Sequence, residues 1–310
     1  GSPLWADAAW RAPFEEAFRA VWTGAAESDR LNSLVLRGDL DWRRIVILRA
    51  IGMYLRQTGS AFSVEYIDEA LLESPAIAAG LIELFELRFD PDVAGDRDAR
   101  AAERAEALRR DLDGVSSLDH DRILRSIIGV IEATLRTNFY QRDAAGDPRP
   151  WVSMKLDCAR VPGLPHPLPM AEIWVYSPEV EGVHLRFGKV ARGGLRWSDR
   201  REDFRTEVLG LVKAQMVKNA VIVPTGSKGG FVAKRLPAPT DRAAWLEGGR
   251  AAYRTFIRGL LDVTDNRDGT DILPPAGVVR HDDDDPYLVV AADKGTATFS
   301  DIANGISGEY

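Results

Sequence analysis

Five side chains in the second half of the sequence have the chemistry of a site for a small anion. Arg192, Gln215, Lys218 and Lys228 supply a guanidinium group, an amide and two amines, and Asp293 supplies a carboxylate. Cationic groups bind a substrate carboxylate, and an amine beside a carboxylate can exchange protons with a substrate. The sequence therefore predicts a site for a small anionic substrate, positioned by one helix and two buried strands.

A helix predicted over Asp199–Asn219 positions two of these side chains. Asp199, with Glu202 three residues later, has the pattern of a helix start. Five residues then follow at spacings of three or four and share one helical face: Phe204, Val208, Leu211, Gln215 and Lys218. An anionic ligand would stabilise the charge of Lys218 on this face, whereas a frayed helix end would simply expose it to solvent.

Lys228 lies in a glycine-rich segment after a short apolar stretch. Residues 220–223 are wholly apolar, which is typical of a strand covered on both faces. Thr225–Gly230 then predicts a turn at the carboxyl end of that strand, where open α/β sheets bind ligands. The phosphate-loop pattern G-x-x-x-x-G-K-[ST] is absent because Gly229 follows Lys228. The segment favours a catalytic amine over a nucleoside triphosphate site.

Asp293 comes directly after a second apolar stretch, Leu288–Ala292. We predict a strand there, with Asp293 at an end equivalent to that of Lys228. A carboxylate in this place could take part in proton transfer, although a single aspartate after a strand is also explained by a turn or a helix cap. Arg192 offers a planar fork for a substrate carboxylate, or else forms an ordinary surface ion pair.

The residues before this site predict a helical region. Six stretches carry apolar residues at helical spacing, or the mixed charges of a solvated helix face: Trp10–Trp22, Trp42–Thr58, Val64–Leu72, Ile77–Phe89, Arg97–Asp113 and Ile123–Tyr140. This half shows no catalytic spacing, so we expect a role in packing, hinge motion or assembly. The turn-rich linker at 143–150 separates a helical region over residues 1–145 from a second domain over residues 146–310.

Strands and helices alternate after the linker. The predicted strands are Trp151–Asp157, Ala171–Tyr176, Val183–Phe187, 220–223 and Tyr287–Ala292, and the predicted helices are Asp199–Asn219 and Arg242–Leu261. This alternation predicts an α/β fold, with a mixed and partly parallel sheet in the second domain. The acidic run Asp282–Asp285 is interpreted as a solvated loop, with a metal site as the minor alternative.

Composition limits the classes of partner. The 310 residues carry a net charge of −7, which provides no basic field for nucleic acid or anionic lipid. An apolar run of the ~20 residues that span a bilayer is absent, as is the pattern of a signal peptide. The single cysteine, Cys158, excludes an internal disulfide and a cysteine-based zinc site. We expect a cytoplasmic protein that holds no metal.

Four motifs together resemble the glutamate/leucine/phenylalanine/valine dehydrogenase family, and within it the large bacterial NAD-specific glutamate dehydrogenases. They are G-G-L-R at 193–196, K-A-Q-M-V-K-N at 213–219, P-T-G-S-K-G-G at 224–230 and A-D-K-G-T at 292–296. The resemblance covers residues from about Lys189 to Tyr310. G-G-L-R or G-S-K-G-G alone would be weak evidence, but the four in this order are specific.

The resemblance implies a catalytic role for two residues. Lys228 matches the lysine that activates water for attack on the iminium carbon and stabilises the resulting oxygen anion. Asp293 matches the aspartate that shuttles protons to and from the substrate amine.

The resemblance also implies a substrate-binding group. Lys218, with Gln215 one helical turn before it, matches the pair near the substrate α-carboxylate. Arg192, followed by Gly193 and Gly194, stands where smaller family members have a lysine that holds the side-chain carboxylate. This departure leaves the role of Arg192 open. The segment before residue 224 is also one residue shorter than in the smaller family members, which leaves the substrate pose open.

The reaction implied by the resemblance is oxidation of L-glutamate to 2-oxoglutarate and ammonium, with NAD as cofactor. G-x-G-x-x-G after a strand is absent from this sequence, so we expect the dinucleotide-binding Rossmann domain downstream of the chain. The chain alone should then be inactive, and the whole protein a homo-oligomer. Two alternatives stay open: a dehydrogenase of another amino acid, and a non-catalytic regulatory or assembly module.

Overall fold

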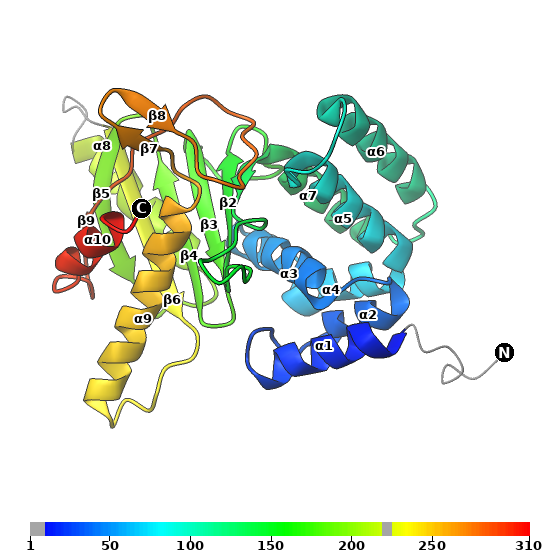
Figure 1. Cartoon of the computed structure of the whole chain (residues 1–310), viewed down its shortest axis with the longest axis horizontal. Helices are drawn as coiled ribbons and strands as arrows, with labels where there is room; N and C mark the ends of the chain where they lie inside the picture. The colour runs from blue at the N-terminus through cyan, green and yellow to red at the C-terminus, as the bar shows by residue number, and fades with distance from the viewer. Residues whose placement is uncertain (1–9, 219–224) are drawn as a thin grey trace. The chain divides into compact units, whose positions relative to one another are not determined.

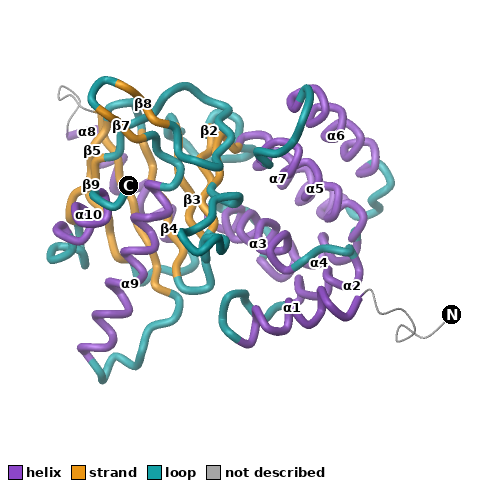
Figure 2. The backbone as a smooth tube through the Cα atoms, viewed as in Figure 1, coloured by secondary structure: helices purple, strands orange, loops and turns teal. Residues whose placement is uncertain are grey.

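The computed structural model describes residues 10–218 and 225–310, apart from the side chains of residues 216–218. Within these residues the chain forms two compact units. Tyr54–Ser60 belongs with Glu132–Tyr310 to the second unit, and the other described residues form the first. The first unit is built of helices, whereas the second contains the strands (Figure 2).

The helical region matches most of the sequence prediction. In chain order it contains α1 (Arg11–Trp22), the 3-10 helix η3 (Arg30–Ser33), α2 (Leu34–Arg37), α3 (Trp42–Gln57), α4 (Val64–Glu73), α5 (Pro75–Phe89), α6 (Arg97–Leu112) and α7 (Leu118–Ala133) (Figure 1). Side-chain oxygens of Ser63 and Asp96 accept hydrogen bonds from backbone N–H groups in the first turns of α4 and α6. The helix predicted over Ile123–Tyr140 is wrong in its second half. A strand starts at Thr134, and three of its four residues are buried polar side chains: Thr134, Arg136 and Thr137.

The second unit is built on a mixed sheet. Its strands are β1 (Thr134–Thr137), β2 (Val152–Asp157), β3 (Ala171–Tyr176), β4 (Val180–Arg186), β5 (Ala191–Trp197), β6 (Thr225–Ala233) and β9 (Val289–Ala292). Among the described residues their order is β1-β2-β3-β4-β6-β5-β9. Neighbours from β1 to β6 are antiparallel, whereas β5 is parallel to both β6 and β9. The predicted α/β fold with a mixed sheet is confirmed. The strands β7 (Asn266–Asp268) and β8 (Asp271–Leu273) form a separate hairpin.

One prediction at a glycine-rich segment is wrong, because Thr225–Gly230 is part of strand β6 and not a turn. Residues 191–197 form strand β5, which was not predicted from the sequence. Both segments gain strand structure from close backbone pairing, which apolar periodicity does not report. The strand predicted over 220–223 lies outside the described residues.

Helix α8 (Phe204–Lys218) begins five residues later than predicted, so Asp199 does not cap it. The first helical hydrogen bond joins Glu207 N to Asp203 O at 3.1 Å. The next residue after the helix start, Arg205, is fully buried and forms an ion pair with buried Glu172 of β3 at 2.6 Å. A buried ion pair requires this good geometry, and it fixes the start of α8 on the sheet.

Helices α8 and α9 (Arg242–Leu261) cover opposite faces of the sheet. A side chain at Gly230 of β6 would meet Val208 of α8, whereas the next residue, Phe231, packs against Phe256 of α9. Successive residues of a strand point to opposite faces, so the two contacts identify the two layers. Helix α9 crosses in front of the sheet in Figure 1, and α10 (Ser300–Ser307) packs beside it. Aromatic side chains dominate the core on the α9 face: Phe231, Tyr253, Phe256 and Phe299.

Gly193 allows β5 to approach β6 closely. A Cβ atom at this position would lie 1.6 Å from the carbonyl oxygen of Ser227, which is closer than any side chain could tolerate. The strands would have to separate to admit it. The glycine is therefore a packing requirement of the parallel pair.

We predict that Gly193→Ala lowers the free energy of unfolding by about 2–3 kcal/mol because the backbone must shift. Gly210→Ala is the matched control: Gly210 lies exposed on α8 with open space around its Cα, so alanine should raise stability by up to about 1 kcal/mol. Urea unfolding followed by circular dichroism measures both changes. Equal stability of Gly193→Ala and the parent chain would contradict the packing argument.

Candidate active site

Lys228 lies in the middle of β6 and faces α8. Its neighbours on the same face are Gly226 and Gly230, whose missing side chains would touch Gln215 and Val208 of α8. Because these two neighbours are glycines, Gln215 and Val208 of α8 can lie close to β6 beside the lysine. Lys228 is 19% exposed, so its amine remains accessible.

Asp293 follows β9 and forms an ion pair with Lys228. The Lys228 Nζ and Asp293 Oδ2 atoms are 2.5 Å apart. Strand β5 lies between the two parent strands, so the contact passes over one intervening strand. At that point β5 carries Gly194, where a Cβ atom would lie only 2.9 Å from Asp293 Cβ. A larger residue there would separate the amine from the carboxylate.

The turn Asp293–Thr296 holds the aspartate in place. Thr296 N donates to Asp293 O at 3.2 Å, and Gly295 adopts a positive φ of 86°, which glycine tolerates at this turn position. The buried Thr296 hydroxyl donates to Leu195 O on β5 at 2.6 Å and accepts from Asp293 N at 3.0 Å. The D-K-G-T sequence is therefore fastened to β5 by backbone and hydroxyl groups.

Arg196 lies in the site but was not among the site residues predicted from the sequence. Its guanidinium group lies 3.1 Å from Asp293 Oδ1 and 2.8 Å from Glu207 Oε1 of α8. The alternation of β5 places Arg192, Gly194 and Arg196 on one face, and this period of two was the signal available in the sequence. The sequence indicated Arg196 only as the last residue of the G-G-L-R motif.

Hydrogen bonds hold Asp293 in its charged form. Burial alone would raise its pKa, but hydrogen bonds from Lys228, from Lys294 N–H and from Arg196 outweigh that effect and lower the pKa to about 2. Lys228 Nζ contacts Oδ2, whereas Arg196 and Lys294 N contact Oδ1. At neutral pH the centre of the site is therefore an anion among cationic and N–H donors.

The structure joins two of the predicted binding residues. Gln215 Nε2 donates to the carbonyl oxygen of Arg192 at 3.2 Å, which ties α8 to β5. The Arg192 side chain is exposed and shares the α8 face of the sheet with Lys228. The backbone of Lys218 ends α8, and its side chain lies outside the described part of the chain. Gly193 faces the opposite side, toward Ser227.

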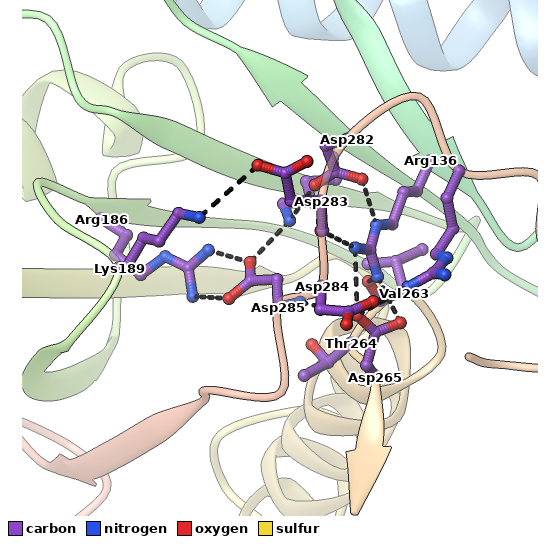
Figure 3. A network of polar contacts seen from close by, with 12 residues as sticks. Arg136, Arg186, Lys189, Val263, Thr264, Asp265, Asp282, Asp283, Asp284 and Asp285 are labelled. Carbon is purple, nitrogen blue, oxygen red and sulfur yellow. Dashed lines mark hydrogen bonds and ion pairs between the residues drawn. The ribbon is translucent and has the colours of Figure 1, made fainter. Parts of the chain in front are cut away.

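The acidic run is not a solvated loop, because two of its carboxylates enter a network of ion pairs (Figure 3). Lys155 Nζ lies 2.5 Å from Asp282 Oδ2 and 2.6 Å from Asp285 Oδ2, and Asp285 also pairs with Arg186. Arg136 bridges Asp282 and the fully buried Asp265. We call these six residues the ionic cluster. It attaches the segment leading into β9 to strands β1, β2 and β4, and so fixes the approach to Asp293.

The described part of the chain contains neither a cluster of metal ligands nor a helix that could span a membrane. Among those residues His, Cys, Asp and Glu side chains do not gather in any group of three suited to a metal ion. The described helices also lack the combination of length and apolarity needed to cross a bilayer.

Two strand-to-helix connections lack the turn that holds a dinucleotide. A pyrophosphate is held in parallel sheets by a glycine-rich turn between a strand and the following helix. The turn from β5 to α8 is Ser198–Asp203, and the segment from β6 to α9 is Lys234–Asp241. Neither contains a glycine. These two strand-to-helix connections therefore offer no cradle for NAD.

Comparison with known proteins identifies the family of the chain. Residues 107–310 match the family described as bacterial NAD-glutamate dehydrogenase, catalytic domain, and residues 26–91 match glutamate dehydrogenase, helical motif 3. The chain belongs to the bacterial NAD-glutamate dehydrogenase family.

Three curated relatives are named NAD-specific glutamate dehydrogenase. That of Halomonas elongata is 57% identical over 97% of this chain, that of Mycobacterium tuberculosis 56% over 96%, and that of Pseudomonas aeruginosa 55% over 96%. The chain spans only 18%, 19% and 18% of their respective lengths. It therefore corresponds to about a fifth of each relative.

We predict that Asp285→Asn lowers the free energy of unfolding by about 3–5 kcal/mol, because Lys155 and Arg186 would keep buried charges without a full partner. Asp283→Asn is the matched control. Asp283 is 93% exposed in the same loop, and its loss should change stability by less than about 0.5 kcal/mol. Urea unfolding compares the two variants, and equal effects would show that the ionic cluster does not stabilise the fold.

Acid should weaken the same cluster. Burial would raise the pKa values of Asp265 and Asp285, but hydrogen bonds from Arg136 to the first and from Arg186 to the second contribute to pKa values below the ordinary 3.8. Each of these carboxyl groups has a lower pKa in the folded state than in the unfolded state. Its contribution to stability is therefore complete above the unfolded-state pKa and is lost as pH falls through the folded-state pKa. We expect unfolding free energy to drop below about pH 4, and to drop less steeply in Asp285→Asn. Denaturant titrations between about pH 6 and pH 2 test this.

Proposed function

We propose that the chain supplies the substrate-binding and catalytic residues of an NAD-dependent glutamate dehydrogenase, which converts L-glutamate to 2-oxoglutarate and ammonium. The observation that carries this proposal is the Lys228–Asp293 ion pair, set on a glycine-lined sheet face together with Arg192 and Gln215. The names of the relatives support the same activity.

The proposed catalytic work of Lys228 and Asp293 is proton transfer. Deamination of an amino acid needs a base for the substrate amine, a base for the water that attacks the iminium carbon, and an acid for the departing ammonia. Lys228 can act as a base only as the neutral amine, so it first passes its own proton to Asp293, which delivers that proton to the departing amine. The neutral Lys228 then takes a proton from the attacking water, and the resulting ammonium group stabilises the oxygen anion. Their direct hydrogen bond lets a proton pass between them.

The proposed substrate is a dicarboxylate because Arg192 shares the sheet face of the pair and the resemblance assigns Lys218 to the same site. In this assignment Lys218 and Gln215 bind the α-carboxylate, and Arg192 binds the side-chain carboxylate through its guanidinium fork. Gly193 and Gly194 contribute by bringing β5 against its neighbours, so that the substrate can approach the backbone. Neutral amino acids such as leucine would leave the Arg192 charge without a partner.

NAD is proposed as the hydride acceptor because the relatives are named NAD-specific. Its site is assigned to a part of the polypeptide other than the two strand-to-helix connections described above. The chain alone should therefore not turn over. We further propose that the whole protein is cytoplasmic and homo-oligomeric, with the helical unit serving packing or assembly. The single buried cysteine, Cys158, supports a reducing compartment.

Calorimetric titration of 2-oxoglutarate into the chain should show saturable binding. Arg192→Ala and Lys218→Ala should each weaken it roughly 10- to 100-fold, because each removes a charge-assisted hydrogen bond. Lys189→Ala is the control: Lys189 is 70% exposed and contacts only the surface carboxylate of Asp283 in the described structure, so affinity should not change. Binding that is unaffected by both site variants would contradict the proposed substrate site.

In a polypeptide with the length of the relatives, Lys228→Ala should lower kcat for NADH formation from glutamate by at least about 100-fold. The reason is that no other described amine contacts Asp293 Oδ2. Lys189→Ala again serves as control. Full turnover by the Lys228→Ala enzyme would rule out the catalytic assignment.

A further inference from the structure

The guanidinium group of Arg196 lies between two carboxylates. Arg196 Nη1 donates to Glu207 Oε1 at 2.8 Å, and Nη2 donates to Asp293 Oδ1 at 3.1 Å. All three side chains are partly buried, with exposed fractions of 14–19%. A pair that is shielded from water to this degree interacts more strongly than a surface pair.

Glu207 is itself held in place. Its second oxygen, Oε2, accepts a hydrogen bond from the Ser198 hydroxyl at 2.6 Å. Glu207 also stands in the first turn of α8, where a negative charge is favoured by the helix dipole. The carboxylate that orients Arg196 therefore has a fixed position of its own on the helix.

The two oxygens of Asp293 have different partners. Oδ1 accepts from Arg196 and from the Lys294 N–H group, whereas Oδ2 accepts from Lys228. Rotation of the carboxylate would break the contacts on both sides. Arg196, together with the Lys294 N–H group, thus holds the carboxylate in an orientation that turns its other oxygen toward the lysine.

We propose that Arg196 and Glu207 are a positioning pair for the reaction: they keep Asp293 as a carboxylate with Oδ2 directed at Lys228. This inference rests on the proposed function, because it concerns the proton transfer assigned to Asp293. Neither residue contacts the substrate in this assignment. Arg196 acts through Asp293, and Glu207 acts through Arg196.

The proposal predicts different effects on the pKa of Asp293 for the two members of the pair. The groups that face the Asp293 carboxylate are Lys228 from β6, Arg196 from β5 and the Lys294 N–H group of its own turn. Arg196→Gln removes one cation, so the pKa of Asp293 should rise from about 2 toward 3.8. Glu207→Gln removes a competing anion but keeps an oxygen acceptor for Arg196, so the pKa should not rise.

The test is a carboxyl carbon-13 NMR titration of the chain, with the Asp293 signal assigned from Asp293→Asn. Arg196→Gln should weaken the acidity of Asp293 about tenfold, Arg196→Lys should restore most of the shift, and Glu207→Gln should leave the midpoint unchanged or lower. Arg200→Gln is the matched control, since Arg200 pairs with Asp203 at an exposed site in the turn between β5 and α8. An identical Asp293 midpoint in Arg196→Gln and the parent chain would overturn the proposal.

A kinetic measurement separates this inference from the proposed function. In the full-length enzyme, Arg196→Gln should lower kcat at least about tenfold while the KM for glutamate changes little, and it should move the acidic limb of the pH–rate profile to higher pH. A rise in KM alone, with kcat and the acidic limb unchanged, would contradict positioning. Full activity of Lys228→Ala would instead defeat the proposed function, while the NMR result would still report on the Arg196 contact.

Discussion

The site depends on one contact, the 2.5 Å hydrogen bond between Lys228 and Asp293 across an intervening strand. An amine and a carboxylate can meet in this way only if the strand between them carries no side chain at that point. Gly194 satisfies that condition, and Gly193 lets the same strand lie close to β6. The glycines of β5 therefore serve the geometry of the sheet first, and the chemistry follows from it.

Other parts of the second unit hold the two ends of this contact. The ionic cluster attaches the segment before β9 to β1, β2 and β4, and the Thr296 hydroxyl attaches the following turn to β5. On the other side, Arg205 and Glu172 fix the start of α8, which carries Glu207 and Gln215. The charged residues that stabilise the fold are thus different from those assigned to catalysis, although both groups lie close to the same strands.

The sequence allowed the α/β fold, most helices and the chemical types in the site to be predicted, because apolar spacing and the four motifs are local signals. It did not show that Thr225–Gly230 is a strand, since glycine-rich strands are defined by backbone pairing. Arg196 was missed because its role depends on two carboxylates that are distant in the sequence. The acidic run was misinterpreted for the same reason: Asp282 and Asp285 look solvated until Lys155, Arg136 and Arg186 are placed around them.

The parallel pairing of β5 with β9 has a consequence for the order in which the chain folds. Leu195 is paired with Ala292, so β9 can join the sheet only after the whole intervening segment has been made and its long loop closed. Contacts of this kind form late in folding because loop closure must precede them. During synthesis, β4, β5 and β6 can assemble while β9 is still absent. A nascent chain therefore carries the lysine of the site before its carboxylate arrives, and the edge of β5 stays open for pairing until then.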